Sequence, residues 1–107
     1  MIIENGILID VEYYDIIDGT FIIPEGVTTI GRNAFKDCSS LQEVTIPEGV
    51  TYINDAAFSG CSSLQEITIP EGVTKIYKGA FSGCSSLKKI EIPKGVTKIY
   101  IARGDRI

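Results

Sequence analysis

Apolar residues recur along the chain at a fixed interval of 23 residues. Three full units, 24–46, 47–69 and 70–92, begin with proline and repeat valine, isoleucine, alanine, phenylalanine, cysteine and leucine at the same offsets. Thirteen of the 23 positions are identical in all three units. Self-similarity at a fixed period of this length indicates stacked structural repeats. The sequence therefore predicts a solenoid, in which apolar positions form columns along an axis rather than one central core.

Each unit contains two short segments that are expected to be extended. Residues 41–46 alternate polar and apolar side chains, which predicts a strand that ends at Pro47. Residues 47–49 predict a turn, and residues 50–53 predict a second extended segment. Residues 55–58 suit a single helical or 3₁₀ turn. Because one unit buries too little apolar surface to offset the entropy of ordering its backbone, neighbouring units must stack with their strands paired side by side.

The repeat has a recognisable pattern. The run L-x-x-V-x-I-P-x-x-V-x-x-I-x-x-x-A-F-x-x-C-x-x-L, from Leu41 to Leu64, resembles the 23-residue leucine-rich repeat of the BspA-like (Treponema pallidum-type) family. The resemblance covers residues 21–99. It implies a right-handed leucine-rich-repeat superhelix of mainly short parallel strands joined by short helical or 3₁₀ turns. It also implies a bacterial protein, often on the cell surface, that binds other macromolecules and has no catalytic activity.

The two ends of the chain depart from the repeat. Residues 1–20 predict a hairpin-like cap, because Asn5-Gly6 favours a type I′ turn. The array then spans residues 21–99, and residues 100–107 predict an irregular tail that lacks the alanine-phenylalanine and cysteine positions. The chain therefore stops in mid-repeat, which suggests either a fragment of a longer array or association through an uncovered apolar C-terminal end. The candidate self-association residues are Phe81, Leu87, Ile90, Ile99 and Ile101.

Composition and charge argue against several classes of function. The formal charge of −4 disfavours binding to nucleic acid or to anionic membranes, which needs a basic face. No apolar segment reaches the roughly 20 residues of a membrane span, and the first residues do not form a secretory signal. Without histidine the chain lacks the commonest general base and metal ligand, and no serine or cysteine has a base in a motif beside it. We therefore expect no enzyme activity and no cofactor.

Charge is distributed unevenly along the predicted axis. Residues 1–69 carry a formal charge of −9 and residues 70–107 carry +5. An acidic first part and a basic last part allow two copies to stack head to tail, which is a contact that does not close into a ring. The alternative is that these charges are unrelated surface positions, since exposed charges interact weakly.

The cysteines are predicted to be structural. One occurs in each unit, and no CxxC pair or histidine accompanies them, so a zinc site is not expected. Adjacent strands lie about 4.8 Å apart, which is within reach of a disulfide, but parallel stacked side chains and an odd number of cysteines oppose one. The interpretation is a column of small buried thiols, Cys38, Cys61 and Cys84.

Two further motifs have weak functional interpretations. An acidic cluster near the N-terminus lacks the spacing of a calcium loop and is expected to be solvated; its members are Asp10, Glu12, Asp15 and Asp18. The tripeptide Arg103-Gly104-Asp105 spells an integrin-binding sequence, but so short a match is weak, and a solvated tail is the simpler interpretation.

The surface positions of the strands are the candidate binding site. Repeat scaffolds bind through extended faces, on which residues that vary between units stand on a constant frame. We expect a protein or glycan ligand, contacted by Glu43, Thr45, Glu66, Thr68, Lys89, Glu91, Tyr52, Lys75, Tyr77, Lys98 and Tyr100. The alternative function is a structural spacer or a self-associating array with no ligand but itself. Location at the cell surface or secretion is implied only by the family resemblance.

Overall fold

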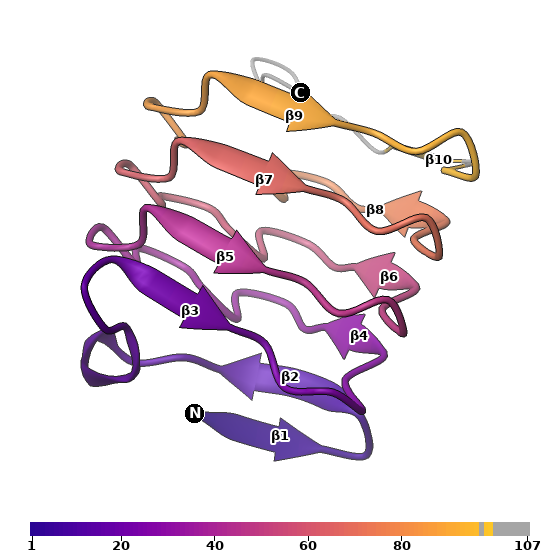
Figure 1. The fold of residues 1–107 in the computed structure, drawn as a ribbon, viewed down its shortest axis with the longest axis horizontal. Coiled ribbons are helices and arrows are strands. Elements are labelled where there is room, and N and C mark those ends of the chain that lie inside the picture. The colour runs from indigo at the N-terminus through magenta and orange to yellow at the C-terminus, as the bar shows by residue number, and fades with distance from the viewer. Residues whose placement is uncertain (97, 100–107) are drawn as a thin grey trace.

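The computed structural model describes residues 1–96 and the backbone of residues 98 and 99. Its elements follow one another along the chain as a stack of similar turns (Figure 1). Their bounds are β1 (Ile2–Glu4), β2 (Ile7–Asp10), the 3₁₀ helix η1 (Tyr13–Asp15), β3 (Thr20–Ile22), β4 (Thr29–Ile30), β5 (Glu43–Thr45), β6 (Tyr52–Ile53), β7 (Glu66–Thr68), β8 (Lys75–Ile76), β9 (Lys89–Glu91) and β10 (Lys98–Ile99). The two predicted extended segments per unit are confirmed.

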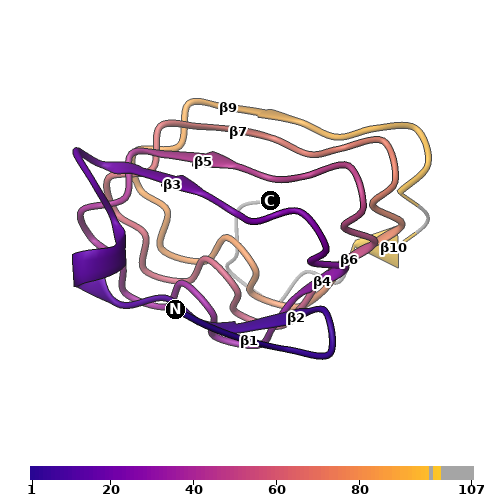
Figure 2. The same cartoon turned by 60° about the horizontal axis from the view of Figure 1, so that its bottom comes forward.

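The strands form two sheets. Sheet A has the order β1-β2-β4-β6-β8-β10, and sheet B has the order β3-β5-β7-β9. All neighbouring strands are parallel except β1 and β2, and the register joins residues 23 apart, such as Ile30 with Ile53 and Val44 with Ile67. Each 23-residue unit is therefore one rung of a solenoid. Figure 2 shows the strands of the two sheets on different sides of this solenoid.

In the three full units, the segment between the end of sheet A and the next strand of sheet B consists of turns rather than helix. Residues 55–58, expected as a helical or 3₁₀ turn, form isolated hydrogen-bonded turns because Ala56 has a left-handed backbone (φ 53°) that no helix accommodates. Their amide groups bond to the next rung instead: the Phe58 N–H donates to the Ala80 carbonyl at 2.8 Å. The turn side thus holds neighbouring rungs together with backbone hydrogen bonds, much as the sheets do.

The core consists of columns of identical residue types. The phenylalanines stack along the axis, with ring centroids 4.7 Å apart for Phe35 and Phe58 and 5.5 Å apart for Phe58 and Phe81. Ile30, Ile53 and the other apolar repeat positions up to Cys84 are buried, and the described part of the chain contains no buried polar or charged side chain. Burial of each large apolar side chain contributes about 1.5–3 kcal/mol to stability. The side chains are buried only when rungs stack, so this contribution depends on stacking.

A threonine column follows the turn between the two sheets. The Thr51 N–H and the Thr51 hydroxyl both donate to the Thr28 carbonyl oxygen, at 2.8 and 3.2 Å. Thr74 repeats both contacts with Thr51, at 2.9 and 3.5 Å. Each hydroxyl therefore reinforces a backbone bond between rungs, which gives this polar column a structural role.

The N-terminal segment adds strands to sheet A. Asn5 and Gly6 both have positive φ, 51° and 77°, as the predicted type I′ turn requires, and they join the antiparallel strands β1 and β2. Strand β2 then pairs with β4 in parallel, so that Leu8 lies in the same buried column as Ile30. Ile3, which pairs with Leu8, stays 38% exposed because no rung covers its side of β1.

The predicted self-association end is described only in part. Phe81 is 5% exposed and stacks on Phe58, so it offers little surface for association, and Leu87 and Ile90 are half-buried against the core. Association through this end stays a prediction. The side chain of Ile99 and all of Ile101 lie outside the described residues. Of the eleven exposed large hydrophobic residues in the described part, nine belong to residues 1–22.

Candidate functional site

The outer face of sheet A carries two adjacent columns of side chains. Because successive residues of a strand point to opposite faces, burial of Ile53 and Ile76 directs Tyr52 and Lys75 outward. The register continues the column from Thr29 through Tyr52 and Lys75 to the backbone of Lys98, as the repeat predicted. The side chain of Lys98 and all of Tyr100 lie outside the described residues.

Two side chains of this column, Tyr52 and Lys75, form a cluster with Tyr77 of the adjacent column. We call this cluster the tyrosine patch. The rings of Tyr52 and Tyr77 meet edge to face with centroids 6.4 Å apart. The Lys75 Nζ lies 5.5 Å from the centroid of the Tyr52 ring, within the range of a cation–π contact. Tyr52 is 39% exposed on a face whose backbone is held by the sheet. The patch therefore offers aromatic, cationic and hydrogen-bonding groups on a rigid frame.

The outer face of sheet B is polar and charged. The register of β5, β7 and β9 places Glu43, Glu66 and Lys89 in one column. It pairs Thr68 with Glu91 in the adjacent column. The six predicted contact residues on these strands are all exposed: Glu43, Thr45, Glu66, Thr68, Lys89 and Glu91.

One ion pair joins neighbouring side chains on this face. The Lys89 Nζ lies 3.1 Å from a Glu91 carboxylate oxygen, and this hydrogen bond raises the pKa of Lys89. Both groups are well exposed, so the pair adds little to stability. The face is an open charged surface with no aromatic side chain among these six residues.

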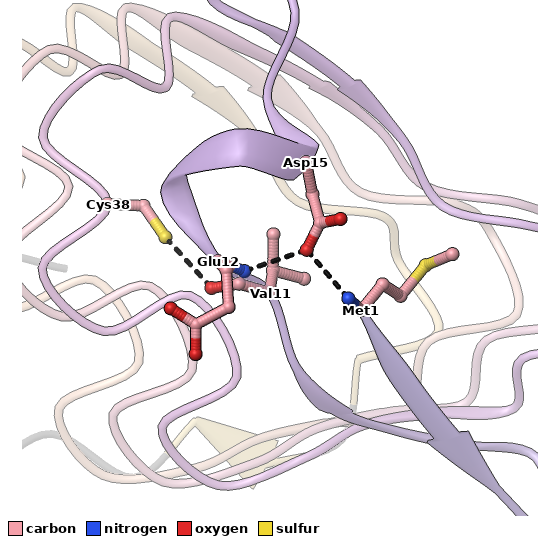
Figure 3. Close-up of polar contacts among 5 residues, drawn as sticks. All are labelled: Met1, Val11, Glu12, Asp15 and Cys38. Atoms are coloured by element: carbon pink, nitrogen blue, oxygen red, sulfur yellow. Dashed lines mark hydrogen bonds and ion pairs between the residues drawn. The ribbon is translucent and has the colours of Figure 1, made fainter.

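The acidic cluster near the N-terminus has a structural role at one of its members. An Asp15 carboxylate oxygen accepts hydrogen bonds from the Met1 ammonium at 2.7 Å and from the Glu12 N–H at 2.9 Å (Figure 3). Both donors favour the ionised carboxylate and lower the pKa of Asp15. Asp10, through a hydrogen bond and its charge, raises the pKa of Glu12. No metal-binding group of three or more acidic, cysteine or histidine residues occurs in the part of the chain that the structure describes.

The cysteines form the expected buried column. The Cys61 thiol donates to the Phe35 carbonyl at 3.1 Å, and the Cys84 thiol donates to the Phe58 carbonyl at 3.1 Å. Cys38 makes the corresponding contact with Val11 at 3.6 Å (Figure 3). Burial raises the pKa of Cys38 and of Cys84 to about 11, and it also raises the pKa of Cys61. These thiols remain protonated at neutral pH and are poor nucleophiles or metal ligands.

A groove on the turn side was not predicted. It crosses three rungs and is lined by Arg32, Asn33, Asp55, Ala56, Ser59, Lys78, Gly79 and Ser82. The signal in the sequence was the column of charged residues Arg32, Asp55 and Lys78, spaced 23 residues apart. The column does not by itself predict a groove, because the shape of the turn side depends on backbone conformations such as the positive φ of Ala56.

The tripeptide Arg103-Gly104-Asp105 lies outside the described residues, and its interpretation as a receptor ligand remains a prediction. Within residues 1–96 and 98–99, no helix combines the length and hydrophobicity that crossing a bilayer requires.

Parallel strands in two sheets, stacked at 23-residue intervals, define a leucine-rich-repeat solenoid. Residues 13–102 match the model of the BspA type leucine rich repeat region in six copies, and the chain belongs to this family. No curated protein matches the sequence.

Solved structures show the same fold. The Treponema pallidum leucine rich repeat protein is 34% identical with a TM-score of 0.73, and the alignment covers 76% of this chain and 40% of that one. A leucine-rich repeat protein from Bacteroides ovatus is 36% identical with a TM-score of 0.73, covering 76% of this chain and 24% of that one. A leucine rich cell surface protein from Faecalibacterium prausnitzii is 32% identical with a TM-score of 0.52, covering 79% and 32%. The chain thus spans less than half the length of each of these proteins.

Proposed function

We propose that this chain is a non-enzymatic interaction module that contacts a protein or glycan ligand through the tyrosine patch of sheet A. The observation that carries the proposal is the contact of exposed Tyr52 with the half-buried side chains of Lys75 and Tyr77, on a sheet whose strands are paired from rung to rung. Tyrosine is enriched among residues that dominate binding energy, because it offers a large rigid surface and a polar hydroxyl.

The chemistry of the remaining side chains favours binding over catalysis. The chain has no histidine and its thiols are buried with raised pKa values, so the cysteines of the described residues are not activated nucleophiles. Leucine-rich repeat proteins typically act as scaffolds for interaction, which supports the same conclusion. The printed description of the Faecalibacterium prausnitzii protein as a cell surface protein supports a location on the bacterial surface for this chain.

The proposal is tested with the variant Tyr52→Ala/Lys75→Ala/Tyr77→Ala and the control Thr45→Ala/Thr68→Ala on sheet B. Labelled proteins are applied to a glycan array and to a panel of purified extracellular matrix proteins. We expect at least tenfold weaker binding by the tyrosine-patch variant and unchanged binding by the control. Equal signals from both variants, or no binding by the unaltered chain, would overturn the proposal. Circular dichroism establishes that both variants are folded.

Self-association is a second candidate function, favoured by the nine exposed large hydrophobic residues within residues 1–22. Exposed apolar patches of this kind mark association sites. Light scattering across a concentration series tests it. The variant Ile17→Ser/Ile22→Ser, which removes two side chains that are 66% and 68% exposed, is expected to shift an oligomer toward the monomer. A monomeric unaltered chain at high concentration would exclude this function.

A further inference from the structure

The groove on the turn side is built from three columns of the repeat. One column consists of Asn33, Ala56 and Gly79, each of which has positive φ (60°, 53° and 69°). The second is the charged column of Arg32, Asp55 and Lys78, and the third contributes Ser59 and Ser82. Because each column runs from rung to rung, the groove runs along the solenoid axis.

The charged column alternates in sign from rung to rung. Arg32, Asp55 and Lys78 present a cation, an anion and a cation, at a rung spacing of about 4.8 Å. Within the described residues, no ion pair and no side-chain hydrogen bond engages the guanidinium, carboxylate or ammonium of these three. Their hydrogen-bonding groups are therefore available to a ligand in the groove.

The backbone of the groove is held by hydrogen bonds between rungs. The Asn33 N–H donates to the Asp55 carbonyl at 3.1 Å and the Ala56 N–H donates to the Lys78 carbonyl at 3.0 Å, which ties these lining residues to the next rung. Because the backbone is already held by these bonds, a ligand does not have to order it. This reduces the entropic cost of binding.

The chemistry of the lining selects the class of ligand. No large apolar or aromatic side chain lines the groove, which argues against an apolar small molecule. A bare anion would interact with Arg32 or Lys78 but would be repelled by Asp55, which stands between them. A molecule with both a carboxylate and many hydroxyls satisfies every group: its carboxylate pairs with a cation, and its hydroxyls donate to Asp55 and exchange hydrogen bonds with Ser59.

We propose that this groove binds an acidic saccharide, with the sugar chain lying along the solenoid axis. The groove has a volume of about 560 Å³ and is largely open to solvent, so a ligand would lie along its surface. A carboxylated sugar pairs with Arg32 or Lys78, and its neighbours in the saccharide chain place hydroxyls against Asp55 and the serines. The lining of this groove shares no residue with the tyrosine patch, so variants can test the two proposals separately.

The probe is a hexasaccharide of alternating glucuronate and N-acetylglucosamine, and the neutral comparison is the hexamer of N-acetylglucosamine. Binding is measured by calorimetry and by amide shifts in ¹H–¹⁵N spectra of the full chain. We expect saturable binding of the acidic probe, with shifts centred on residues 32–33, 55–59 and 78–82. Equal binding of the neutral hexamer, shifts centred on sheet A or absence of binding would each overturn the proposal.

Two pairs of variants separate a site from general attraction of charge. Arg32→Ala/Lys78→Ala and Lys88→Ala/Lys94→Ala remove the same net charge, but only the first pair lies in the groove. We expect at least tenfold weaker binding in the first and less than a twofold change in the second. If both pairs weaken binding of the saccharide equally, the attraction is non-specific electrostatics, and the proposed site is wrong.

A second comparison tests position 56, which lines the groove. Ala56→Asn introduces a longer side chain that Asn33 already carries in the same backbone conformation one rung away, so the variant is expected to fold and to obstruct the groove. Ala56→Gly keeps the groove open. Weaker binding by the asparagine variant alone supports the proposal, and equal binding by both variants contradicts it.

Discussion

The thiol of Cys61 donates a hydrogen bond to the carbonyl oxygen of Phe35, 26 residues earlier, at 3.1 Å. The same oxygen accepts the Cys38 N–H at 3.1 Å, so one carbonyl joins the turn of its own rung to the core of the next. Cys84 and Phe58 repeat this arrangement. The cysteine column therefore connects rungs through hydrogen bonds and has no need of disulfides.

Replacing Cys61 by alanine should destabilise the solenoid. The side chain is fully buried, so truncation leaves a small cavity and removes one hydrogen bond between rungs, together costing about 1–2 kcal/mol. Urea unfolding at neutral pH measures this change. Ser62→Ala, at the exposed neighbouring position, is the control and should change stability by less than about 0.5 kcal/mol.

The cysteines should also make the fold sensitive to alkali. Burial raises the pKa of Cys38 and Cys84 from 9.0 to about 11, so the unfolded chain loses these protons at a lower pH than the folded chain. The contribution of these thiols to the free energy of unfolding is therefore fully present below about pH 9, and it falls as the pH rises toward 11. Urea unfolding between pH 7 and 11 measures the decline, which should be smaller in Cys84→Ala. An identical decline in that variant would show that Cys84 does not contribute.

Ala56 should gain stability on substitution by glycine. Its left-handed backbone, φ 53°, costs an L-residue about 1–2 kcal/mol, and glycine occupies the equivalent position at Gly79. Because glycine has more freedom in the unfolded chain, the net gain for Ala56→Gly should be about 0.5–1 kcal/mol. Thermal unfolding measures it. The adjacent Ala57 has no positive φ and is fully buried, so Ala57→Gly should instead lower the melting temperature.

Gly31 should not tolerate a side chain. A Cβ at this position would lie 2.5 Å from the Leu8 carbonyl oxygen, which is backbone and is held by the Gly31 N–H at 2.8 Å. Gly31→Ala should therefore destabilise the protein by about 1–3 kcal/mol. At Gly49 the nearest atom, the Val27 carbonyl oxygen, would lie 3.7 Å from the Cβ, so Gly49→Ala should be much milder. Equal effects in chemical unfolding would contradict this account.

Asp15 should make the N-terminal segment sensitive to acid. The Met1 ammonium and the Glu12 N–H lower the pKa of the Asp15 carboxylate below its ordinary value of 3.8. The contribution of Asp15 to the stability of the N-terminal segment is present above about pH 4, and it is lost as the pH falls through the lowered folded-state pKa. Amide exchange of residues 1–15 between pH 3 and 6 should show this loss in the unaltered chain and not in Asp15→Asn. Asp18→Asn, with the same change of charge nearby, should behave like the unaltered chain.

The stacking of rungs and the positions of the strands could be predicted from the sequence because the period, the alternation and the proline breaks repeat in every unit. Val44 and Ile67 had to share a buried column once the 23-residue interval was recognised. The Asn5-Gly6 turn was predictable for a local reason, since both residues accept positive φ. The turn over residues 55–58 was predicted less well, because alanine at position 56 gives no sign of a left-handed backbone.

The sequence by itself determined the fold class, the residues that share each column and the identity of the buried apolar and cysteine positions, because a column needs only periodicity. Only the tertiary structure decided which columns meet across strands. It brought Lys75 over the ring of Tyr52, stacked Phe81 on Phe58 and left nine large apolar residues exposed within residues 1–22. It also opened the groove beside Arg32, Asp55 and Lys78. These features depend on backbone φ values and on contacts between side chains of different rungs. The 23-residue interval specifies neither.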